Sequence, residues 1–353
     1  MDLRLRNIYE SLRKAGLDGL ILSHPENITY LSRYRSRDSY LLISRKQNIY
    51  FTDSRYTEEA KNNLKAFSVQ EIHGPAFGAI TQAVCSLGLR NLGFEERYLA
   101  FDQYKKLKES LEEKTRLAPT YGLIEEYRQI KNSEELEKIK KATQITVEAL
   151  RFAGSLIKTG GIREAEVAGE LERFIRYNGG HTSAFDIIVA SGTNSSFPHH
   201  LTSHKRVQEG EPVLIDIGVD YAGYKSDLTR VLFSDRISST FRKVYSIVRK
   251  AQDRAIREVK PGVFINKIDA AARQYIASKG YGGFFSHSLG HGIGLEVHEE
   301  PRIAEKEKNK LKTGMVFTVE PAIYLPGKFG IRIEDMVLVT RKGCEVISGA
   351  LNQ

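Results

Sequence analysis

The segment VLIDIGVDYAGYKSDLTRVLF, residues 213–233, constrains the fold of this chain most strongly. Apolar residues fill both of its ends, as expected of two buried strands, and YAGY at 221–224 is typical of the turn between antiparallel strands. Asp216 and Asp227 interrupt these apolar runs. Burying an unpaired carboxylate is very unfavourable, so a buried acid is expected to have a cation or a proton beside it.

The spacing of the two aspartates about the turn predicts that they are close in space. They lie almost symmetrically on either side of it, and hence within ~5 Å or one diagonal step across the two strands. Two carboxylates so close repel each other, and one takes up a proton unless a cation lies between them. Taken alone, the segment leaves two interpretations open. It is either a cation site or a structural hairpin, which is exposed or has its two acids in salt bridges with Lys225 or Arg230.

Three further segments place a possible metal ligand in a similar context. His291 lies in the glycine-rich sequence SLGHGIG, where small neighbours allow a close approach to the backbone. Glu320 lies in the apolar sequence MVFTVEPAIY, and Glu334 lies in GIRIEDMVLV. Each of these residues alone is compatible with a structural role. The hairpin at 213–233 and the strands of Glu320 and Glu334 are three apolar segments that each contain inward acids, and together they are hard to explain without bound cations.

A count of charges predicts two ions. Asp216, Asp227, Glu320 and Glu334 would supply four negative charges, and His291 would supply a neutral imidazole nitrogen. Two divalent cations balance four carboxylates, whereas one leaves a large excess of buried negative charge. Oxygen-rich ligation with one imidazole favours Mn²⁺, and Co²⁺, Fe²⁺ or Zn²⁺ are possible.

A chain of 353 residues is long for a single core, and its patterns predict two domains. Residues 1–125 alternate between helical and strand patterns, which predicts an α/β domain. The expected elements are a helix at 2–16, a strand at 19–22, a turn at 25–27, strands at 40–43 and 48–51, and a helix at 57–64. We take residues 126–132 as a linker.

Residues 133–353 are expected to form an α+β domain that contains every motif described above. Asn132 or Ser133 is a suitable cap for a helix that runs to about 158. Further helices are expected at 163–178, 238–258 and 264–279, and strands at 315–323 and 330–340.

Composition argues against several classes of protein. No apolar run is long enough to span a membrane, and the charged N-terminus does not resemble a signal peptide. Cys85 and Cys344 give no disulfide framework and fit a reducing cytoplasm. The net charge of +9 comes from basic residues scattered among acids, which favours a mixed-charge surface over a nucleic-acid site. We therefore expect a cytoplasmic protein with no nucleic-acid or membrane partner.

The five candidate ligands, in their order and local motifs, resemble the metallopeptidase family with the pita-bread fold, M24. The motifs are Asp216 in LIDIG, Asp227 in SDLTR, His291 in GHGIG, Glu320 in TVEP and Glu334 in RIED. Their separations of 11, 64, 29 and 14 residues resemble the proline-specific branch, aminopeptidase P and prolidase. Residues 1–125 resemble the creatinase-like N-terminal domain of that branch. The resemblance implies a pita-bread (creatinase/aminopeptidase) catalytic domain in which these five residues hold the metal ions.

The same resemblance implies roles for several histidines. His199, in SSFPHH, matches the histidine that shuttles a proton and stabilises the oxyanion, whereas His200 matches no role and is expected to be structural or exposed. His298, in GLEVHEEP, matches the histidine that contacts the substrate amide near the scissile bond. His287, in HSLGH, matches a histidine that lines the substrate site.

Two arginines also align with basic residues near the substrate site of the family. These are Arg302 and Arg332, for which salt bridges with Glu299 or Glu334 are equally compatible with the sequence. Arg332 would share a face with Glu334 if the strand that contains both is regular.

The implied activity is that of a dinuclear-metal exopeptidase that hydrolyses the Xaa-Pro bond at the N-terminus of peptides or dipeptides. A hydroxide that bridges the ions would be the nucleophile, and Glu320 would take its proton and deliver it to the leaving nitrogen. The expected partners are a proline-containing peptide or dipeptide and a second copy of the chain, whose N-terminal domain would cap the cleft. Two alternatives use the same fold: a catalytically silent binding protein, and a creatinase-like hydrolase of another C–N bond. The presence of all five ligands argues against both.

Overall fold

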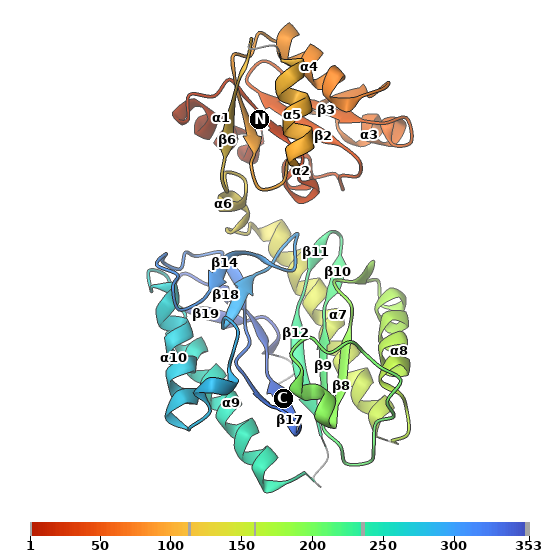
Figure 1. Ribbon diagram of the computed structural model, residues 1–353, viewed down its shortest axis with the longest axis vertical. Coiled ribbons are helices and arrows are strands. Elements are labelled where there is room, and N and C mark those ends of the chain that lie inside the picture. The colour runs from red at the N-terminus through yellow and green to blue at the C-terminus, as the bar shows by residue number, and fades with distance from the viewer. Residues whose placement is uncertain (1, 112–113, 159, 234–236, 350–353) are drawn as a thin grey trace. The chain divides into compact units, whose positions relative to one another are not determined.

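The computed structural model describes residues 2–111, 114–158, 160–233 and 237–349. It divides into two compact units, Met1–Arg128 and Gln129–Gln353, and Figure 1 labels many of their elements. No helix of the described residues is both long enough and apolar enough to cross a membrane.

The N-terminal unit is built on a six-stranded sheet with the order β4-β3-β2-β1-β5-β6. Its strands are β1 Gly19–Leu22, β2 Tyr40–Ser44, β3 Ile49–Thr52, β4 Ser68–Glu71, β5 Asn91–Glu95 and β6 Arg116–Thr120. Its helices are α1 Leu3–Lys14, α2 Pro25–Ser32, α3 Thr57–Asn63, α4 Ala76–Ser86, α5 Phe101–Ser110 and α6 Glu125–Arg128. Apolar residues of α4 and α5, such as Ile80 and Leu107, pack against Leu42, Phe51 and Leu92 of the sheet. The α/β class predicted for this part of the chain is therefore present.

The turn expected at residues 25–27 is wrong, because these residues form the first turn of α2. Pro25 occupies the start of the helix, where its fixed φ suits the helix and its missing N–H group has no partner to lose. Asn27 is fully buried, and its side chain donates to the carboxylates of Glu95 and Glu125. A proline next to polar residues is therefore as compatible with a helix start as with a turn.

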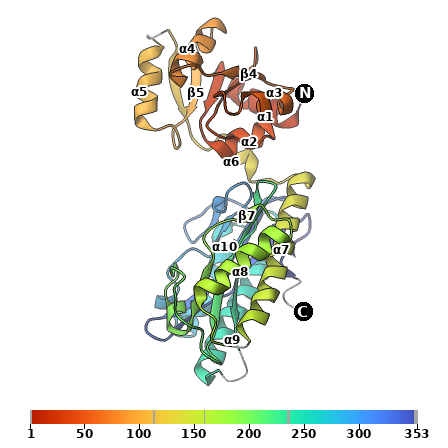
Figure 2. The ribbon, with the colours of Figure 1, turned by 90° about the vertical axis from the view of Figure 1, so that its right-hand side faces the viewer.

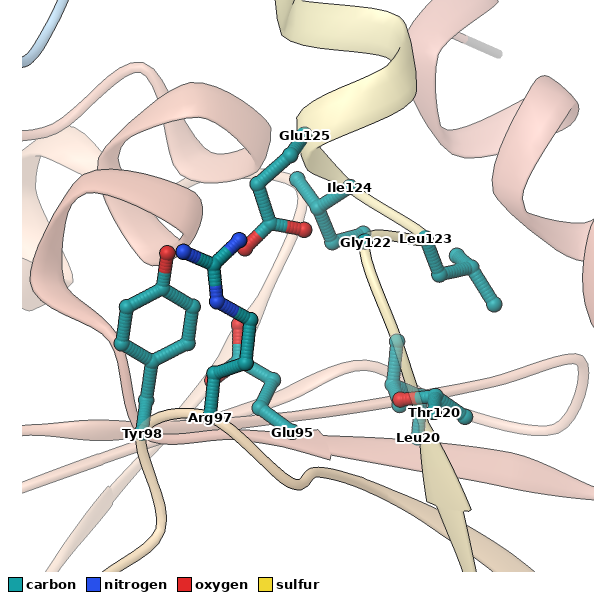
Figure 3. A pocket seen from close by; sticks show the side chains of 9 residues that line it. All are labelled: Leu20, Glu95, Arg97, Tyr98, Thr120, Gly122, Leu123, Ile124 and Glu125. Atoms are coloured by element: carbon teal, nitrogen blue, oxygen red, sulfur yellow. The ribbon is translucent and has the colours of Figure 1, made fainter. Parts of the chain in front are cut away.

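Glu95 borders the small cavity in the N-terminal unit that Figure 3 shows. Its carboxylate accepts hydrogen bonds from the backbone N–H of Ser23 and from Asn27, and Arg128 donates to Asn27 in turn. Burial raises the pKa of Glu95, and the nearby Glu125 carboxylate adds to the shift. The cavity volume of about 10 Å³ is only what one water molecule needs, so a peptide does not fit there.

The C-terminal unit contains four long helices and thirteen short strands within its described residues. The helices are α7 Ser133–Ile157, α8 Glu164–Tyr177, α9 Ser239–Glu258 and α10 Ile265–Ser278, with 3-10 turns η1 Gly192–Ser196 and η2 Gly282–Phe284. The first six strands are β7 Thr182–Ser183, β8 Ile188–Ser191, β9 Val213–Ile217, β10 Val219–Tyr221, β11 Tyr224–Lys225 and β12 Leu228–Leu232. The rest are β13 Gly290–Gly292, β14 Glu299–Ile303, β15 Val316–Val319, β16 Ala322–Leu325, β17 Phe329–Arg332, β18 Asp335–Val339 and β19 Cys344–Val346.

The strands of this unit lie between two pairs of helices (Figure 1). Helices α7 and α8 lie on one side and appear in front of the strands in Figure 2, whereas α9 and α10 lie on the other side. Phe241, Val248 and Ile268 of α9 and α10 pack with Phe317 and Val337 of the sheet β14-β13-β15-β18-β19. All four helices begin and end within two residues of their predicted bounds.

Both acid-bearing hairpins of this unit are interrupted in the middle. The pair β9–β12 gives way to β10–β11 at Gly218 and residues 226–227, and the pair β15–β18 gives way to β16–β17 at residues 320–321 and 333–334. The continuous strands expected at 315–323 and 330–340 are therefore wrong, since each is two strands in different sheets. Pro321 lacks the N–H group that a regular ladder needs, which favours a break at this position.

Candidate metal centre

The aspartate hairpin has the geometry predicted from its sequence. Asp216 in β9 pairs in register with Thr229 of β12, so Asp227 lies one diagonal step from it. The connecting turn has left-handed backbone at Ala222, with φ 51°, and at Gly223, with φ 87°. Positive φ at both central residues is the signature of a tight two-residue hairpin turn, which fixes the register of the aspartates.

The two glutamates lie at the break of the second hairpin, between its paired ends. The backbone N–H of Glu320 donates to the carbonyl of Leu289 at 2.8 Å, and that of Glu334 donates to the carbonyl of Thr229 at 3.1 Å. The Thr229 hydroxyl also donates to Oε2 of Glu334 at 2.8 Å. The break therefore frees the backbone of both glutamates to bind neighbouring segments, and Thr229 joins Glu334 to the aspartate hairpin.

Gln252 is fully buried on α9, and its side chain binds the backbone at the break of the second hairpin. Its Nε2 donates to the carbonyls of Val319 and Ile333, at 3.1 Å in each case. These carbonyls belong to the residues directly before Glu320 and Glu334. One amide group thereby fixes the spacing of the backbones that carry both glutamates.

His291 in β13 faces the acids as a neutral base. Its Nε2 lies 3.6 Å from Oδ2 of Asp227 and 3.5 Å from Oε1 of Glu320. Its Nδ1 lies 3.1 Å from the carbonyl of Gly292, and because a carbonyl can only accept, Nδ1 carries the hydrogen and Nε2 presents a lone pair. Burial, with the neighbouring His298, lowers the pKa of His291 to about 4. A neutral imidazole cannot neutralise the acids that it faces.

The glycines around His291 have a packing role in addition to the one expected. A Cβ at Gly290 would lie 1.9 Å from the carbonyl oxygen of Thr318, and a Cβ at Gly292 would lie 2.2 Å from that of Glu300. Both contacts are with backbone, which cannot move aside cheaply. The glycines therefore let β13 lie close to its neighbours, and this closeness places His291 beside the acids.

Each carboxylate of the cluster disfavours the ionised form of its neighbours. Burial raises the pKa of Asp227 well above its ordinary value, and the carboxylates of Glu334 and Asp216 raise it further. Burial raises the pKa of Glu334 well above its ordinary value in the same way, with Glu320 next in importance. Burial also raises the pKa of Glu320 to about 8. Without a cation, the cluster would hold protons at neutral pH.

The donor set fits divalent cations. Asp227, His291 and Glu334 each bring one ligand atom within 4.8 Å of the others. Among the described residues, Oδ1 of Asp216, Oδ1 of Asp227 and Oε1 of Glu334 are buried and have no hydrogen-bond partner. Buried carboxylate oxygens without donors are the groups that a bound cation would complete. Oxygen atoms with one imidazole nitrogen suit Mn²⁺ and similar ions.

The two structural alternatives, an exposed hairpin and a pair of acids salt-bridged by Lys225 or Arg230, are both wrong. Asp227 is only 5% exposed. Lys225 binds Oδ2 of Asp220 at 2.9 Å, and Arg230 binds Oδ1 of Asp335 at 2.6 Å, so both basic residues of the hairpin have other partners.

Arg332 supplies one positive charge to the acids. It binds Oδ2 of Asp216 at 2.6 Å rather than Glu334, and it also donates to Tyr324 and to the Thr229 hydroxyl. One guanidinium cannot balance four carboxylates. The excess charge of the cluster is therefore consistent with more than one bound ion.

The candidate substrate residues lie around this cluster. The His291 and His298 rings meet edge to face with centroids 4.3 Å apart, and burial lowers the pKa of His298. Burial also lowers the pKa of His287 to about 4, and Nε2 of His287 lies 3.3 Å from the Tyr324 hydroxyl. The exposed ring of His199 contributes to the lowered pKa of both His287 and His298, which places it near both rings.

Arg302 is less closely connected to the cluster. It lies opposite His291 in the register of β13 and β14, and it is exposed. Glu299, one of its possible salt-bridge partners, binds Lys131 at 2.6 Å.

Comparison with protein-family models gives a match for each of the two units. Residues 137–341 match the model of metallopeptidase family M24, and residues 4–130 match that of the creatinase/prolidase N-terminal domain. The chain belongs to metallopeptidase family M24. Its fold is thus a creatinase/prolidase N-terminal α/β domain followed by a pita-bread catalytic domain, as its sequence predicts.

Similar proteins match this M24 peptidase over almost its whole length. A protein of Bacillus subtilis (strain 168) named an uncharacterized peptidase is 37% identical over 345 residues, which cover 98% of this chain and 96% of that protein. The structure of an Xaa-Pro dipeptidase from Bacillus anthracis has a TM-score of 0.93 at 38% identity and covers 98% of this chain and 96% of that one. An X-Pro aminopeptidase from Thermotoga maritima has a TM-score of 0.88 at 38% identity, with 96% and 97% covered.

The structure of this M24 peptidase adds residues that sequence reasoning missed. Gln252 and Thr229 carry no motif, since one lies in an ordinary amphipathic helix and the other in an apolar strand. Glu164 was not predicted to have a role either, because an acid in the first turn of a helix is usually a solvent-exposed capping residue. His200, expected to be structural or exposed, is half-buried and binds Glu164 at 3.0 Å.

Proposed function

We propose that this M24 peptidase hydrolyses the Xaa-Pro bond at the N-terminus of peptides or dipeptides. It would use two divalent ions, Mn²⁺ in first place and Co²⁺, Fe²⁺ or Zn²⁺ as alternatives. The ligands would be Asp216, Asp227, His291, Glu320 and Glu334. The observation that carries the proposal is the buried cluster of carboxylate oxygens without donors, which face a neutral imidazole. The specificity is supported by similar proteins named Xaa-Pro dipeptidase and X-Pro aminopeptidase.

Bound divalent ions would polarise the scissile carbonyl and lower the pKa of water toward neutrality. Glu320 is the residue of this chain best suited to move the proton. Its carboxyl lies beside His291 in the cluster, and its Oε1 lies 3.4 Å from the Thr318 hydroxyl. A carboxylate next to the attacking water can accept its proton and pass it to the leaving proline nitrogen.

His199 is proposed to stabilise the oxyanion. Its ring is exposed beside His287 and His298, so a bound peptide can reach it. A hydrogen bond from the ring to the developing negative oxygen is of the kind whose removal costs ~3 kcal/mol, or about a hundredfold in rate.

The remaining residues would orient the substrate. His298, next to His291, would contact the amide at the scissile bond. His287, Arg302 and Arg332 would line the site. The free N-terminal amine would meet the acids of the cluster, which makes the enzyme an exopeptidase.

We also infer a cytoplasmic homodimer in which the N-terminal domain of one copy caps the cleft of the other. The catalytic domain would comprise residues 133–353 and be joined by a linker at 126–132 to the N-terminal domain at 1–125. Sedimentation of the full chain at micromolar concentration tests the dimer, and a monomer at all concentrations would contradict it.

Rates on Gly-Pro and on Arg-Pro-Pro, with Mn²⁺, Co²⁺ or Zn²⁺ added separately to metal-stripped protein, test the function and distinguish a dipeptidase from an aminopeptidase. We expect metal-dependent cleavage that is lost in Asp216→Asn and His291→Ala and retained in His73→Ala, whose side chain is exposed. Normal metal-dependent cleavage by Asp216→Asn would contradict the proposal. A wild-type protein that binds no metal and cleaves neither peptide would instead indicate a silent binding protein.

A further inference from the structure

The segment Ser191–Ser203, here called the His199 segment, is anchored by a buried acid outside the metal cluster. The acid is Glu164, which lies in the first turn of α8 and is 0% exposed. The backbone N–H groups of Glu164 and Ala165 also donate to the carbonyls of Lys205 and Ser203. The start of α8 and the end of the segment are therefore joined by main chain and side chain together.

The two oxygens of Glu164 bind both ends of the His199 segment. Oε1 accepts from the N–H of Ser191 at 2.7 Å, from its hydroxyl at 2.8 Å and from the Asn194 amide at 3.0 Å. Oε2 accepts from His200 at 3.0 Å, from the Ser203 hydroxyl at 2.6 Å and from its N–H at 3.2 Å. His199 lies between these two groups of donors. A bond at the adjacent His200 fixes the backbone from which the His199 ring projects.

The opposite side of the segment is held by β17, close to the metal cluster. The N–H of Gly330 donates to the Ser195 hydroxyl at 2.9 Å, and Arg332, which binds Asp216, donates to the carbonyl of Pro198 at 3.2 Å. A Cβ at Gly330 would lie 2.0 Å from the carbonyl oxygen of Ser195, so the segment lies directly on the strand. The residues on either side of His199 are therefore fixed against β17 and against α8.

We propose that Glu164 is a positioning residue that fixes the His199 ring at the distance from the metal cluster at which it can meet the substrate carbonyl. This inference rests on the role of His199 in the proposed function. Both oxygens of Glu164 accept several hydrogen bonds, and the donors come from residues on both sides of the exposed His199 in the sequence. Replacing the carboxylate with an amide puts an NH₂ group against N–H and O–H donors, which forces one end of the segment to move.

Glu164→Gln, with Glu170→Gln as its control, tests the proposal in the full-length enzyme. Glu170 lies on the same helix and pairs with Arg173 at an exposed position, so the control makes the same chemical change away from the segment. We expect Glu164→Gln to lower kcat on an Xaa-Pro peptide by ~10- to 100-fold with little change in KM, because a misplaced catalytic group costs about this much. Bound metal should be unchanged, and Glu170→Gln should match the wild type.

A double mutant separates positioning from general stability. If Glu164 acts through His199, adding Glu164→Gln to His199→Ala should lower kcat by less than a further factor of about two. Losses that multiply, or a normal kcat in Glu164→Gln, would overturn the proposal. Should Glu164→Gln fail to fold, Ser203→Ala, which removes a single donor to Glu164, is expected to lower kcat in the same direction with the same non-additivity.

An NMR measurement without substrate tests the position of the His199 ring independently of the proposed function. In protein with ¹⁵N-labelled histidine, the ring resonances of His199, identified by their loss in His199→Ala, should shift in Glu164→Gln and stay in place in Glu170→Gln. Unshifted resonances would overturn the positioning role. If the wild type cleaves no Xaa-Pro peptide while the resonances shift, the proposed function fails and the structural anchor stands.

Discussion

Glu164 and Glu334 are both buried carboxylates of the catalytic domain, 0% and 2% exposed, and their surroundings are opposite. Although burial acts in the other direction, hydrogen bonds from Ser203, Ser191 and His200 lower the pKa of Glu164 to about 2. Burial and the Glu320 carboxylate instead raise the pKa of Glu334 well above its ordinary value. Glu164 accepts on both oxygens, whereas Oε1 of Glu334 is without a partner among the described residues.

The difference shows how to tell a structural buried acid from a candidate metal ligand. The donors of serine, asparagine and histidine complete the first acid within the protein, so nothing further is needed to keep it charged. The second acid lies at a break between sheets, where neighbouring positions hold other acids and a histidine that offers a lone pair. Only a cation or a proton can complete such an acid, which is the reason for proposing a metal-binding cluster there.

Replacing Glu334 should give the largest effect. In Glu334→Gln one carboxylate oxygen and one charge leave the cluster, and we expect the loss of Xaa-Pro activity to exceed the ~10- to 100-fold typical of an outer-shell residue. The same change should raise the melting temperature of the metal-free protein, because it removes repulsion among buried acids. Elemental analysis and thermal melts in chelator measure both, with the exposed Glu345→Gln as the control. An unchanged metal content in Glu334→Gln would refute the distinction between the two acids.

Gln252→Leu should give the next largest effect, through the backbone instead of the carboxylates. It leaves the carbonyls of Val319 and Ile333 without the amide donor, at a cost of ~1–3 kcal/mol for each buried group. We expect a lower melting temperature and a weaker affinity for Mn²⁺ by calorimetry. Gln144→Leu, at an exposed position of α7, is the control. A destabilised variant with unchanged Mn²⁺ affinity would show that the break does not need α9 for its geometry.

The hairpin and the helices of the catalytic domain were predictable because their signals are local. The period of the apolar residues and the caps give α7 to α10, and the YAGY turn gives the register that places Asp216 and Asp227 diagonally. Four of the five candidate ligands could be named because acids in apolar strands are rare, and His291 because it lies in a glycine-rich motif. In residues 65–120, by contrast, the strands and helices of the N-terminal domain were not expected, since short amphipathic elements there give weak periodic signals.

The breaks at Glu320 and Glu334 and their support could not be predicted in the same way. An apolar run indicates a strand, but it does not indicate in which sheet each half of the strand pairs. Tertiary packing decides that pairing. The partners of Glu164 lie ~30 to 40 residues away in the sequence and include ordinary serines, so no local motif marks them. The N–H of Glu320 and the amide of Gln252 likewise bind groups that only the fold brings together.

The two kinds of acid should also differ in how they couple stability to pH. The folded pKa of Glu320 is raised to about 8 from an ordinary value of 4.5, and those of Asp227 and Glu334 are raised as well. For such groups the folded state binds more protons, so the metal-free protein should lose stability as the pH rises from about 6.5 to about 8. This range lies above the one in which the lowered pKa values of His287 and His291 have the opposite effect. Denaturant melts in chelator across this range measure the slope. Saturation with Mn²⁺ should flatten or reverse it, and a metal-free protein whose stability rises with pH would contradict the assignment.

Glu164 should give the opposite slope in a different range, and the smallest effect. Its folded pKa of about 2 lies below the ordinary 4.5, so its contribution is complete above pH 4.5 and disappears as the pH falls toward 2. In this range Glu164→Gln should lose less stability on acidification than the wild type, because the amide binds no proton. Denaturant melts at half-unit steps from pH 5 to pH 3, with Glu170→Gln as the control, measure the difference between the slopes. Parallel slopes in the wild type and Glu164→Gln would mean that Glu164 is not held as a carboxylate, and the contrast with Glu334 would then be lost.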